Sequence, residues 1–339
     1  MSRALDRETV ASLQSNDTHI VYNDIVRGLC QERTQLLEIE LLGKSHPIPA
    51  GQNFLLEENS IAIPKVKLVQ AFVVARQIFF ELLKKPLYEK RDELRNATAV
   101  MLLMDPENLT AANARKRLIE SCREGSKEEV QLALERELLF VDSYLTARLH
   151  RHTKSPTLWS HRRWILQICH SVQLEYDIQR DLRTVVLIAA ERHPRNYYAW
   201  SHMRWLVQTF GVKDAERNEM LLIVNDWCLR HPGDTSGFSF LLFFLASFGC
   251  PEDPSRIEAS TRVFRDVLDL ATSFKWTHES VWVFLRTLAA SGEVTEAQTI
   301  SFSRKADAIL AAHPDNPQVG LTFKAAIAWF EKYQRRPYT

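Results

Sequence analysis

The chain has 339 residues, of which 45% are hydrophobic and 25% are charged, so it can bury a sizeable core as one large repeat domain or two ordinary domains. Its formal net charge is +1, which gives a nucleic-acid-binding surface no bulk electrostatic support. Only 10 residues are glycine, a composition that favours helices over tight-turned β structure. We therefore expect a helical protein that does not bind nucleic acid.

The first predicted elements are helices interrupted by one irregular segment. A helix is expected over residues 18–42, because its apolar residues share roughly one helical face. Residues 43–64 carry several glycines and prolines and are expected to be loop or short extended structure. Helices are expected again over residues 65–84, 89–104 and 110–122.

Helix then follows helix to the end of the chain. Capping boxes, in which a serine or threonine is followed three residues later by an acid or a glutamine, begin at Ser126, Ser255 and Thr295. No break in composition divides this part of the chain. We therefore predict an N-terminal helix and irregular segment, residues 1–64, packed on a solenoid of helical repeats, residues 65–339.

One six-residue phrase occurs twice, 41 residues apart, as Trp159-Ser160-His161-Arg162-Arg163-Trp164 and Trp200-Ser201-His202-Met203-Arg204-Trp205. Such self-similarity indicates a repeat architecture. Weaker copies place anchor positions at Ala112, Trp159, Trp200, Phe238 and Trp282, with a sixth at Gly320. This spacing leaves room for two helices and their turns in each repeat. The prediction is an all-α fold, an α-α superhelix built from helical hairpins.

The repeat spacing also predicts structural roles for the residues of these phrases. Aromatic residues at equivalent positions should point inward, with each indole N–H bonded to a carbonyl of the preceding turn. Arg162 and Arg204 are expected to pair with acids of an adjacent repeat and so fix the stacking register. His161 and His202 are expected to be hydrogen-bonded structural histidines. The predicted anchors are Trp159, Arg162, Trp164, Trp200, Arg204, Trp205, Phe238 and Trp282.

At these residues the sequence resembles the α subunits of the protein prenyltransferases, whose repeat reads roughly Pro-x-Asn-Tyr-x-x-Trp-x-x-Arg-x-x-Leu. The segment from His193 to Arg204 matches this pattern nearly throughout, and the resemblance covers about residues 90–290. A closer resemblance, to members that approach the second-repeat tryptophan through Lys-Ser-Pro, rests on Lys154-Ser155-Pro156 and on Ser236-Gly237-Phe238. The resemblance implies an α-α superhelix wrapped around a separate β subunit.

The function that the resemblance implies is that of the α subunit of a heterodimeric enzyme. Its β subunit binds zinc, and the pair transfers a prenyl group from a prenyl diphosphate to a cysteine of a protein substrate. The closer resemblance implies geranylgeranyl transfer. This chain has no HExxH motif and no paired Cys/His ligands, so we expect no metal or cofactor in it and no activity without its partner. His150 and His152 are expected to be solvated, because residues two apart do not share a helix face.

The resemblance also implies residues that face the substrates. Lys154, five residues before Trp159, corresponds to a lysine that reaches the diphosphate, although it also fits an exposed loop lysine at a helix N-terminus. Asn196 and Tyr197 correspond to an Asn-Tyr pair near the isoprenoid diphosphate. Thr157 stands where members that read CaaX substrates have a glutamine, which argues against ordinary CaaX recognition.

The alternative function is a non-catalytic helical-repeat scaffold for protein–protein interaction. Lys154, Asn196 and Tyr197 favour the enzyme subunit, whereas the eroded repeats at Ala112, Phe238 and Gly320 favour the scaffold. The first fifteen residues lack the apolar core of a signal peptide, and no apolar run approaches the ~20 residues of a transmembrane helix. We therefore expect a cytoplasmic protein. The sequence does not identify the acceptor protein, and it leaves both a farnesyl and a geranylgeranyl donor open.

Overall fold

In the computed structural model the chain is described over residues 18–84, 90–123 and 125–334. The N-terminal residues that carry the signal-peptide prediction lie outside these ranges. Backbone contacts divide the chain into two compact units, Met1–His202 and Met203–Thr339, with the division inside one helix. The division predicted between residues 64 and 65 stays a prediction. It coincides with the junction between a strand and the helix that follows it.

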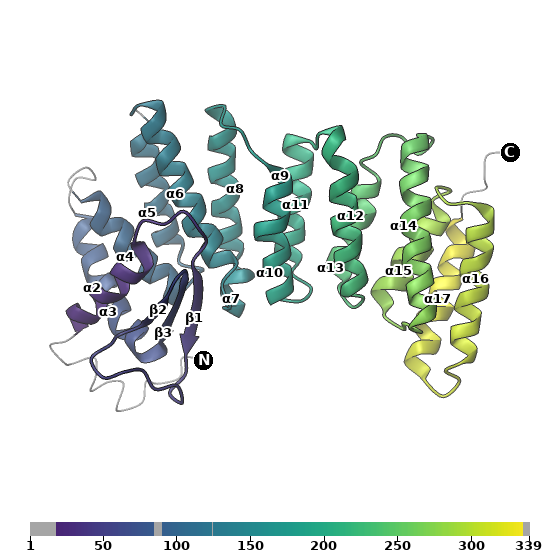
Figure 1. Cartoon of the computed structure of the whole chain (residues 1–339), viewed down its shortest axis with the longest axis horizontal. Helices are drawn as coiled ribbons and strands as arrows, with labels where there is room; N and C mark the ends of the chain where they lie inside the picture. Colours follow the sequence, from purple (N-terminus) through teal and green to yellow (C-terminus); the bar gives the residue numbers. More distant parts are fainter. Residues whose placement is uncertain (1–17, 85–89, 124, 335–339) are drawn as a thin grey trace. The chain divides into compact units, whose positions relative to one another are not determined.

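The first unit consists of helices and one small sheet (Figure 1). Helix α5 packs against α8, and α6 packs against both, so consecutive helices form hairpins whose members stack on the next pair. The elements of this unit are α2 Thr18–Cys30, β1 Glu38–Leu42, β2 Leu55–Glu57, β3 Ser60–Pro64, α3 Lys65–Leu82, α4 Arg91–Met104, α5 Leu109–Cys122, α6 Lys127–Leu145, α7 His150–Thr153, α8 Pro156–Ser171, α9 Ile178–Asp181, a π-helical turn Leu182–Val186 and α10 Leu187–Arg192.

The second unit repeats the hairpin in two layers. Helices α13, α15 and α17 contact one another in that order, and α12, α14 and α16 form the layer that packs on them. The division between the units falls within α11, Tyr197–Phe210. The remaining elements are α12 Asp214–Arg230, α13 Thr235–Leu245, α14 Pro254–Ser273, α15 Glu279–Ala290, α16 Glu296–Ala311 and α17 Pro317–Tyr333. The predicted all-α class, built from helical hairpins, is confirmed. Within the described residues, no helix has both the length and the apolarity to cross a membrane.

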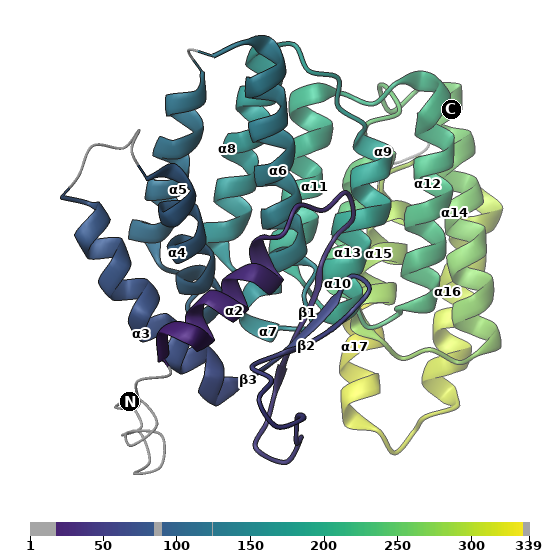
Figure 2. The ribbon, with the colours of Figure 1, turned by 60° about the vertical axis from the view of Figure 1, so that its left-hand side comes forward.

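The predicted helix over residues 18–42 is wrong in its second half, because the helix ends at Cys30 and residues 38–42 form strand β1. The sheet has the order β1-β3-β2, with β1 parallel and β2 antiparallel to β3, and it lies next to α2 (Figure 2). Leu37 and Ile39 are buried and alternate with exposed residues, which is the period of a strand. Their backbone groups bond to the Ser143 hydroxyl and to the Arg148 N–H. Pairing with β3 therefore outweighs the helical pattern.

Two of the three predicted capping boxes are present. Ser126 and Thr295 each accept a hydrogen bond from the third residue of their helix, and that residue's side chain bonds back to the capping N–H. The box predicted at Ser255 is wrong, because α14 starts at Pro254, two residues earlier than a cap at Ser255 would place it. Its cap is Asp253, whose carboxylate accepts from the Ser255 N–H at 2.9 Å. An acid before a proline supplies the same acceptor, so the helix takes the earlier start.

The anchors of the repeat occupy one helical position. In α5, α8, α13 and α17 a capping side chain accepts from the third helical N–H, and the anchor is the fourth helical residue. Trp159, Trp200 and Trp282 are at most 2% exposed, as is Phe238. The indole N–H of Trp159 donates to the Thr153 carbonyl at 2.9 Å, and that of Trp282 donates to the Trp276 carbonyl at 2.8 Å. Trp159 and Trp282 are therefore each fixed to the residue six positions before them.

Candidate functional site

The carbonyl of Thr153 joins two repeats at the start of α8. It accepts the Trp159 indole N–H at 2.9 Å and the Asn196 side-chain amide at 2.8 Å. The same amide donates to the Ala189 carbonyl at 3.2 Å, and its oxygen accepts from the Ala199 N–H at 3.3 Å. Thr153 is 1% exposed, so these bonds lie in the core. The backbone that leads into Lys154 is therefore held rigidly.

The predicted contact between Asn196 and a substrate does not agree with this arrangement. Asn196 is 0% exposed, and its amide is bonded to three backbone groups. An asparagine placed in this way caps α11 and ties it to the turn before α8. The sequence pattern identified an important residue, but the structure gives it a positioning role. Asn196 holds the turn from which Lys154 projects.

Lys154 follows the short helix α7 and stands two residues before the first residue of α8. It is half-buried, and Ser155 after it caps α8 by accepting from the Leu158 N–H at 3.1 Å. The N-terminal end of a helix carries unpaired N–H groups and a partial positive charge, which favours anions. The predicted placement of a cation at such an end is therefore present in the structure.

Further basic side chains gather beside Lys154. The ring of His193, at the end of α10, meets the ring of His150 edge to face, with centroids 4.0 Å apart. Burial, and then the charges of Lys154 and His150, lower the pKa of His193 to about 4. A neutral His193 can donate one N–H hydrogen bond to an anion without adding to the local charge. The candidate site is this basic group, namely Lys154, His150 and His193.

Tyr197 lies on the other side of the bond between Asn196 and Thr153. Its side chain is 67% exposed, and its ring meets that of Tyr198 edge to face at 5.8 Å. Lys154 follows Thr153, and Tyr197 follows Asn196. The bond between Asn196 and Thr153 therefore places Lys154 and Tyr197 at the N-terminal ends of α8 and α11. Tyr197 is therefore free of the core and available to a partner or a ligand, as a substrate-facing residue must be.

His152 is not solvated, in contrast to the prediction. It is 4% exposed, and its Nε2 bonds to the Leu102 carbonyl at 3.1 Å. Burial lowers its pKa to about 4, and the two backbone bonds to Leu102 and Leu103 only partly offset this. His150 is exposed, as predicted. The spacing argument separated the two histidines correctly, but it did not show that one of them faces the core.

The burial of His152 should make the stability of the protein depend on pH. An unfolded histidine has a pKa near 6.5, so below that pH the unfolded chain binds a proton that folded His152 binds only near pH 4. The contribution of neutral His152 to the free energy of unfolding is fully present above pH 6.5 and is lost as the pH falls toward 4. The loss is about 2 kcal/mol at pH 5. Urea unfolding at pH 7 and pH 5 should show that His152→Gln reduces the loss, because glutamine can still donate to Leu102. The exposed control His46→Gln should leave the loss unchanged, and an equal loss in all three proteins would contradict the prediction.

Arg162 ties three helices together, as predicted for the stacking register. Its guanidinium donates to Asp142 on α6 at 2.6 and 3.3 Å and to Asp181 on α9. It also donates to the Tyr176 hydroxyl at 3.3 Å and to Nε2 of His202 at 2.7 Å. Burial and the nearby Asp181 raise the pKa of Asp142 to about 6, although Arg162 acts in the opposite direction. Burial and Arg162 hold the pKa of His202 far below its ordinary value, so His202 accepts this bond as a neutral ring.

A second buried ion pair lies one repeat earlier. Arg115 on α5 donates twice to Glu137 on α6, at 2.8 Å each, and His161 bonds to the same carboxylate at 2.7 Å. Burial alone would raise the pKa of Glu137, but Arg115 and His161 outweigh it and hold that pKa well below its usual range. Both predicted histidines of the phrase, His161 and His202, thus bond to buried charged groups of the repeat stack.

Arg162 and Arg204 are not equivalent in the repeat. Arg162 is the third residue after its anchor, whereas Arg204 is the fourth and corresponds to Arg163. The predicted acid partner of Arg204 is replaced by other groups, because its guanidinium donates to the Ser239 carbonyl at 3.2 Å and lies 4.6 Å from the Phe243 ring centre. The third position after the anchor is Arg115 and Arg162 in the first unit. In the second unit it is buried and apolar, and its residues are Met203, Leu241, Leu285 and Phe323.

The fourth position after the anchor carries a half-buried cation in four repeats. Within the first unit, Lys116 lies 5.4 Å from the ring centre of Trp164 on the next helix of its layer. Trp164 and Trp205 are themselves half-buried, so the second tryptophan of each phrase lies at the edge of the core. Lys116, Arg163, Arg204 and Arg286 are the cations at this position. They form a surface series that is distinct from the buried arginines.

Two family models match the chain within this region. The model described as the protein prenyltransferase alpha subunit repeat matches residues 134–169, which include the second half of α6, all of α7, Lys154 and most of α8. The model described as the ECM9 middle domain matches residues 157–265. The predicted resemblance to the prenyltransferase α subunit family is confirmed by the first of these matches and by the similarity to curated proteins.

Those curated proteins carry the repeat in their names. The protein prenyltransferase alpha subunit repeat-containing protein 1-A of Xenopus laevis is 30% identical over 213 residues, which are 57% of this chain and 46% of that protein. Protein 1-B of the same organism is 30% identical over 144 residues, 42% of this chain and 30% of that protein. The human protein 1 is 31% identical over 115 residues, 33% of this chain and 25% of that protein. The matched segment thus spans less than half the length of each relative.

Proposed function

We propose that this chain, which carries the prenyltransferase α subunit repeat, is the α subunit of a heterodimeric protein prenyltransferase and acts only with a zinc-binding β subunit. The observation that supports the proposal best is Lys154, a half-buried cation at the N-terminal end of α8 within the matched repeat. Its backbone is fixed through the Thr153 carbonyl, which is how a preorganised site is built.

The chemistry that this site would assist is displacement at an allylic carbon. A protein thiolate attacks the first carbon of the prenyl chain, a C–S bond forms, and the C–O bond to the diphosphate breaks. The bonding electrons leave with the diphosphate, so negative charge grows on its oxygens. Lys154, with His150 and His193 beside it, would meet that charge at a helix end that already favours anions.

Zinc, in this proposal, is held by the β subunit and lowers the pKa of the attacking thiol. Within the described part of the chain, no three His, Cys, Asp or Glu side chains come together as they would to hold a metal ion. The donor proposed is geranylgeranyl diphosphate, on the strength of the Lys-Ser-Pro approach at residues 154–156. The compartment proposed is the cytoplasm, where an acceptor cysteine would be reduced.

Co-expression tests this proposal. With a prenyltransferase β subunit of the geranylgeranyl type, the chain should elute from size-exclusion chromatography as a 1:1 heterodimer. The heterodimer should transfer geranylgeranyl to a cysteine-bearing acceptor in the presence of zinc, and neither subunit should do so alone. Separate elution at micromolar concentration, with β subunits of every prenyltransferase class, would rule the proposal out.

The second candidate, a non-catalytic scaffold, is favoured by one observation. The Asn196 side chain of the Asn-Tyr pair is buried and committed to the backbone, so it is not available to a substrate. A stable heterodimer that transfers neither a farnesyl nor a geranylgeranyl group would support the scaffold and reject the enzyme. The two functions therefore separate in the transfer assay and not in the binding assay.

A further inference from the structure

The surface series of cations changes its geometry between α11 and α15 in the second unit. On α11, Arg204 donates to the carbonyl of Ser239, one residue after the anchor of α13, and lies over Phe243, five residues after it. On α15, Arg286 donates to the carbonyl of Ala325 at 3.4 Å and lies 5.0 Å from the ring centre of Trp329. These residues are five and nine positions after Gly320. Arg286 therefore reaches one helical turn further along its neighbour than Arg204 does.

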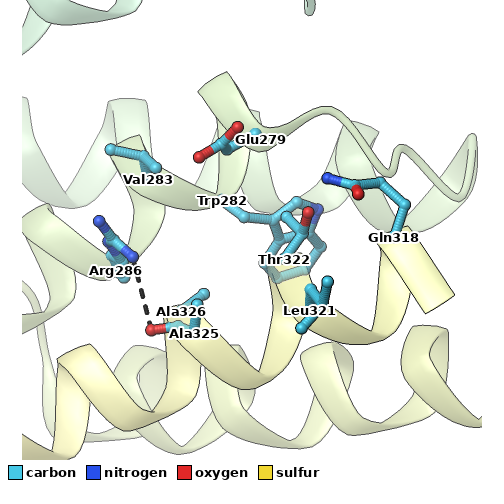
Figure 3. Close-up of a pocket in the computed structure, with 9 residues that line it drawn as sticks. All are labelled: Glu279, Trp282, Val283, Arg286, Gln318, Leu321, Thr322, Ala325 and Ala326. Carbon is cyan, nitrogen blue, oxygen red and sulfur yellow. Dashed lines mark hydrogen bonds between the residues drawn. The ribbon is translucent and has the colours of Figure 1, made fainter.

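This shift leaves a cavity of about 190 Å³ between α15 and α17, which Figure 3 shows with its lining side chains. The cause can be read from the repeat. Where α13 has Phe240, Phe243 and Phe244, α17 has Thr322, Ala325 and Ala326 at the same distances from its anchor. Three phenyl rings are thus replaced by two methyl groups and a threonine side chain. The space that aromatic rings fill beside α13 is open beside α17, two repeats later.

The floor and rim of this cavity are suited to an aromatic ring. The floor is the buried ring of Trp282, and the methyl groups of Ala325 and Ala326 line one side. Arg286, half-buried, and the exposed Glu279 stand on the α15 side (Figure 3). Burial lowers the pKa of Arg286, and its Nε is buried with no hydrogen-bond partner among the described residues. A guanidinium in this state gains from a π face placed against it.

We propose that this cavity receives one aromatic side chain of a partner protein. That side chain takes the place against Arg286 that Phe243 of the same chain takes against Arg204. The size of the cavity favours a side chain over a free small molecule, because small-molecule sites usually measure about 300–1,000 Å³. Leu321, 65% exposed at the rim, extends the apolar surface beyond the cavity. An aromatic anchor in a pocket with an apolar surround is the usual centre of a protein–protein interface.

Indole is the first probe, and the chain can be used as it is. Titrated against the protein, it should bind saturably, on the order of millimolar, and should shift the NMR signals of the Trp282 and Trp329 indole N–H groups. Ala325→Phe, which restores the ring that α13 has at this position, should weaken indole binding at least tenfold and raise the melting temperature. Ala328→Phe is the matched control, because Ala328 is also exposed on α17 but does not line the cavity. Absence of saturable binding, or equal binding to all three proteins, would overturn the proposal.

A random twelve-residue peptide library tests the protein nature of the occupant. Peptides selected on the wild-type protein, after depletion on Ala325→Phe, should carry Trp, Tyr or Phe at one fixed position. If Ala325→Phe folds poorly, Thr322→Phe replaces it, because a phenyl ring at residue 322 fills the same cavity from a neighbouring position. Thr322→Phe should not bind the selected peptides. Enriched peptides without a fixed aromatic residue would overturn the proposal. Neither experiment involves Lys154 or a β subunit, so the outcome is independent of the proposed enzyme activity.

Discussion

Replacing Arg162 by alanine should lower the free energy of unfolding by about 3–5 kcal/mol. Arg162 is 1% exposed and is the cation that faces the carboxylates of Asp142 and Asp181. Its removal would leave two buried carboxylates to repel each other, and one or both would take up a proton at neutral pH. A loss of this size is a large part of the total stability of about 5–15 kcal/mol that a protein has. Urea denaturation followed by circular dichroism measures it.

The neighbouring residue provides a matched control. Arg163 is half-buried and donates to the Ser201 hydroxyl at 3.3 Å, so Arg163→Ala should cost about 1 kcal/mol or less. If the cost of Arg162→Ala comes from uncompensated charge, adding Asp142→Asn and Asp181→Asn should recover part of it. Equal costs for the two arginines would show that Arg162 acts through packing volume and not through its charge.

Replacing Lys154 by alanine should lower the rate of prenyl transfer about 100-fold or more in the proposed heterodimer, without loss of assembly. One donor removed from a preorganised anion site typically costs about 2.7–4 kcal/mol of transition-state stabilisation. Lys154 lies at the N-terminal end of α8, beside His193, and this placement is the reason to expect the loss. Single-turnover transfer to a cysteine-bearing acceptor, with zinc and β subunit held constant, isolates the chemical step.

Two further variants decide what such a loss means. Lys154→Arg keeps the charge in a wider group and should recover part of the rate. Arg151→Ala removes a nearby exposed cation, which pairs with Asp105 at 2.9 Å, and should leave the rate close to that of the wild-type protein. A wild-type rate from Lys154→Ala would return this lysine to a solvated turn and favour the scaffold function.

The helices could be predicted because their signals are local. Capping residues, prolines at helix starts and the 41-residue recurrence of the tryptophan phrase are all visible in the chain itself. The strand over residues 38–42 could not be predicted in this way. Its alternation is only a few residues long, and it becomes a strand by pairing with residues 60–64, which lie about twenty residues further on. The start of α14 was missed because two acceptors, Asp253 and Ser255, compete for one helix end.

The candidate site was predicted in part. The position of Lys154 follows from its distance to Trp159, a distance set by the regular geometry of the turn and helix. The roles of Asn196 and His152 depend on which side of the turn is buried. That is decided by distant partners, since Asn196 bonds to Thr153, 43 residues before it, and His152 bonds to Leu102 on α4, 50 residues before it. The acids that bind Arg162 lie 20 residues before and 19 after it, on helices of two different hairpins. No short pattern in the chain marks Asp142 or Asp181 as its partners.

The third position after each anchor carries a consequence for how this protein can change over evolutionary time. Inserting or deleting one residue in a helix turns every later side chain by about 100°. In α5 or α8 this would swing Arg115 or Arg162 away from its carboxylates and strand charges in the core. In α13 or α15, where the position holds Leu241 or Leu285, other apolar side chains can repack around the change. Lineages of this chain should therefore accumulate length changes within the later helices and conserve the lengths of α5 and α8.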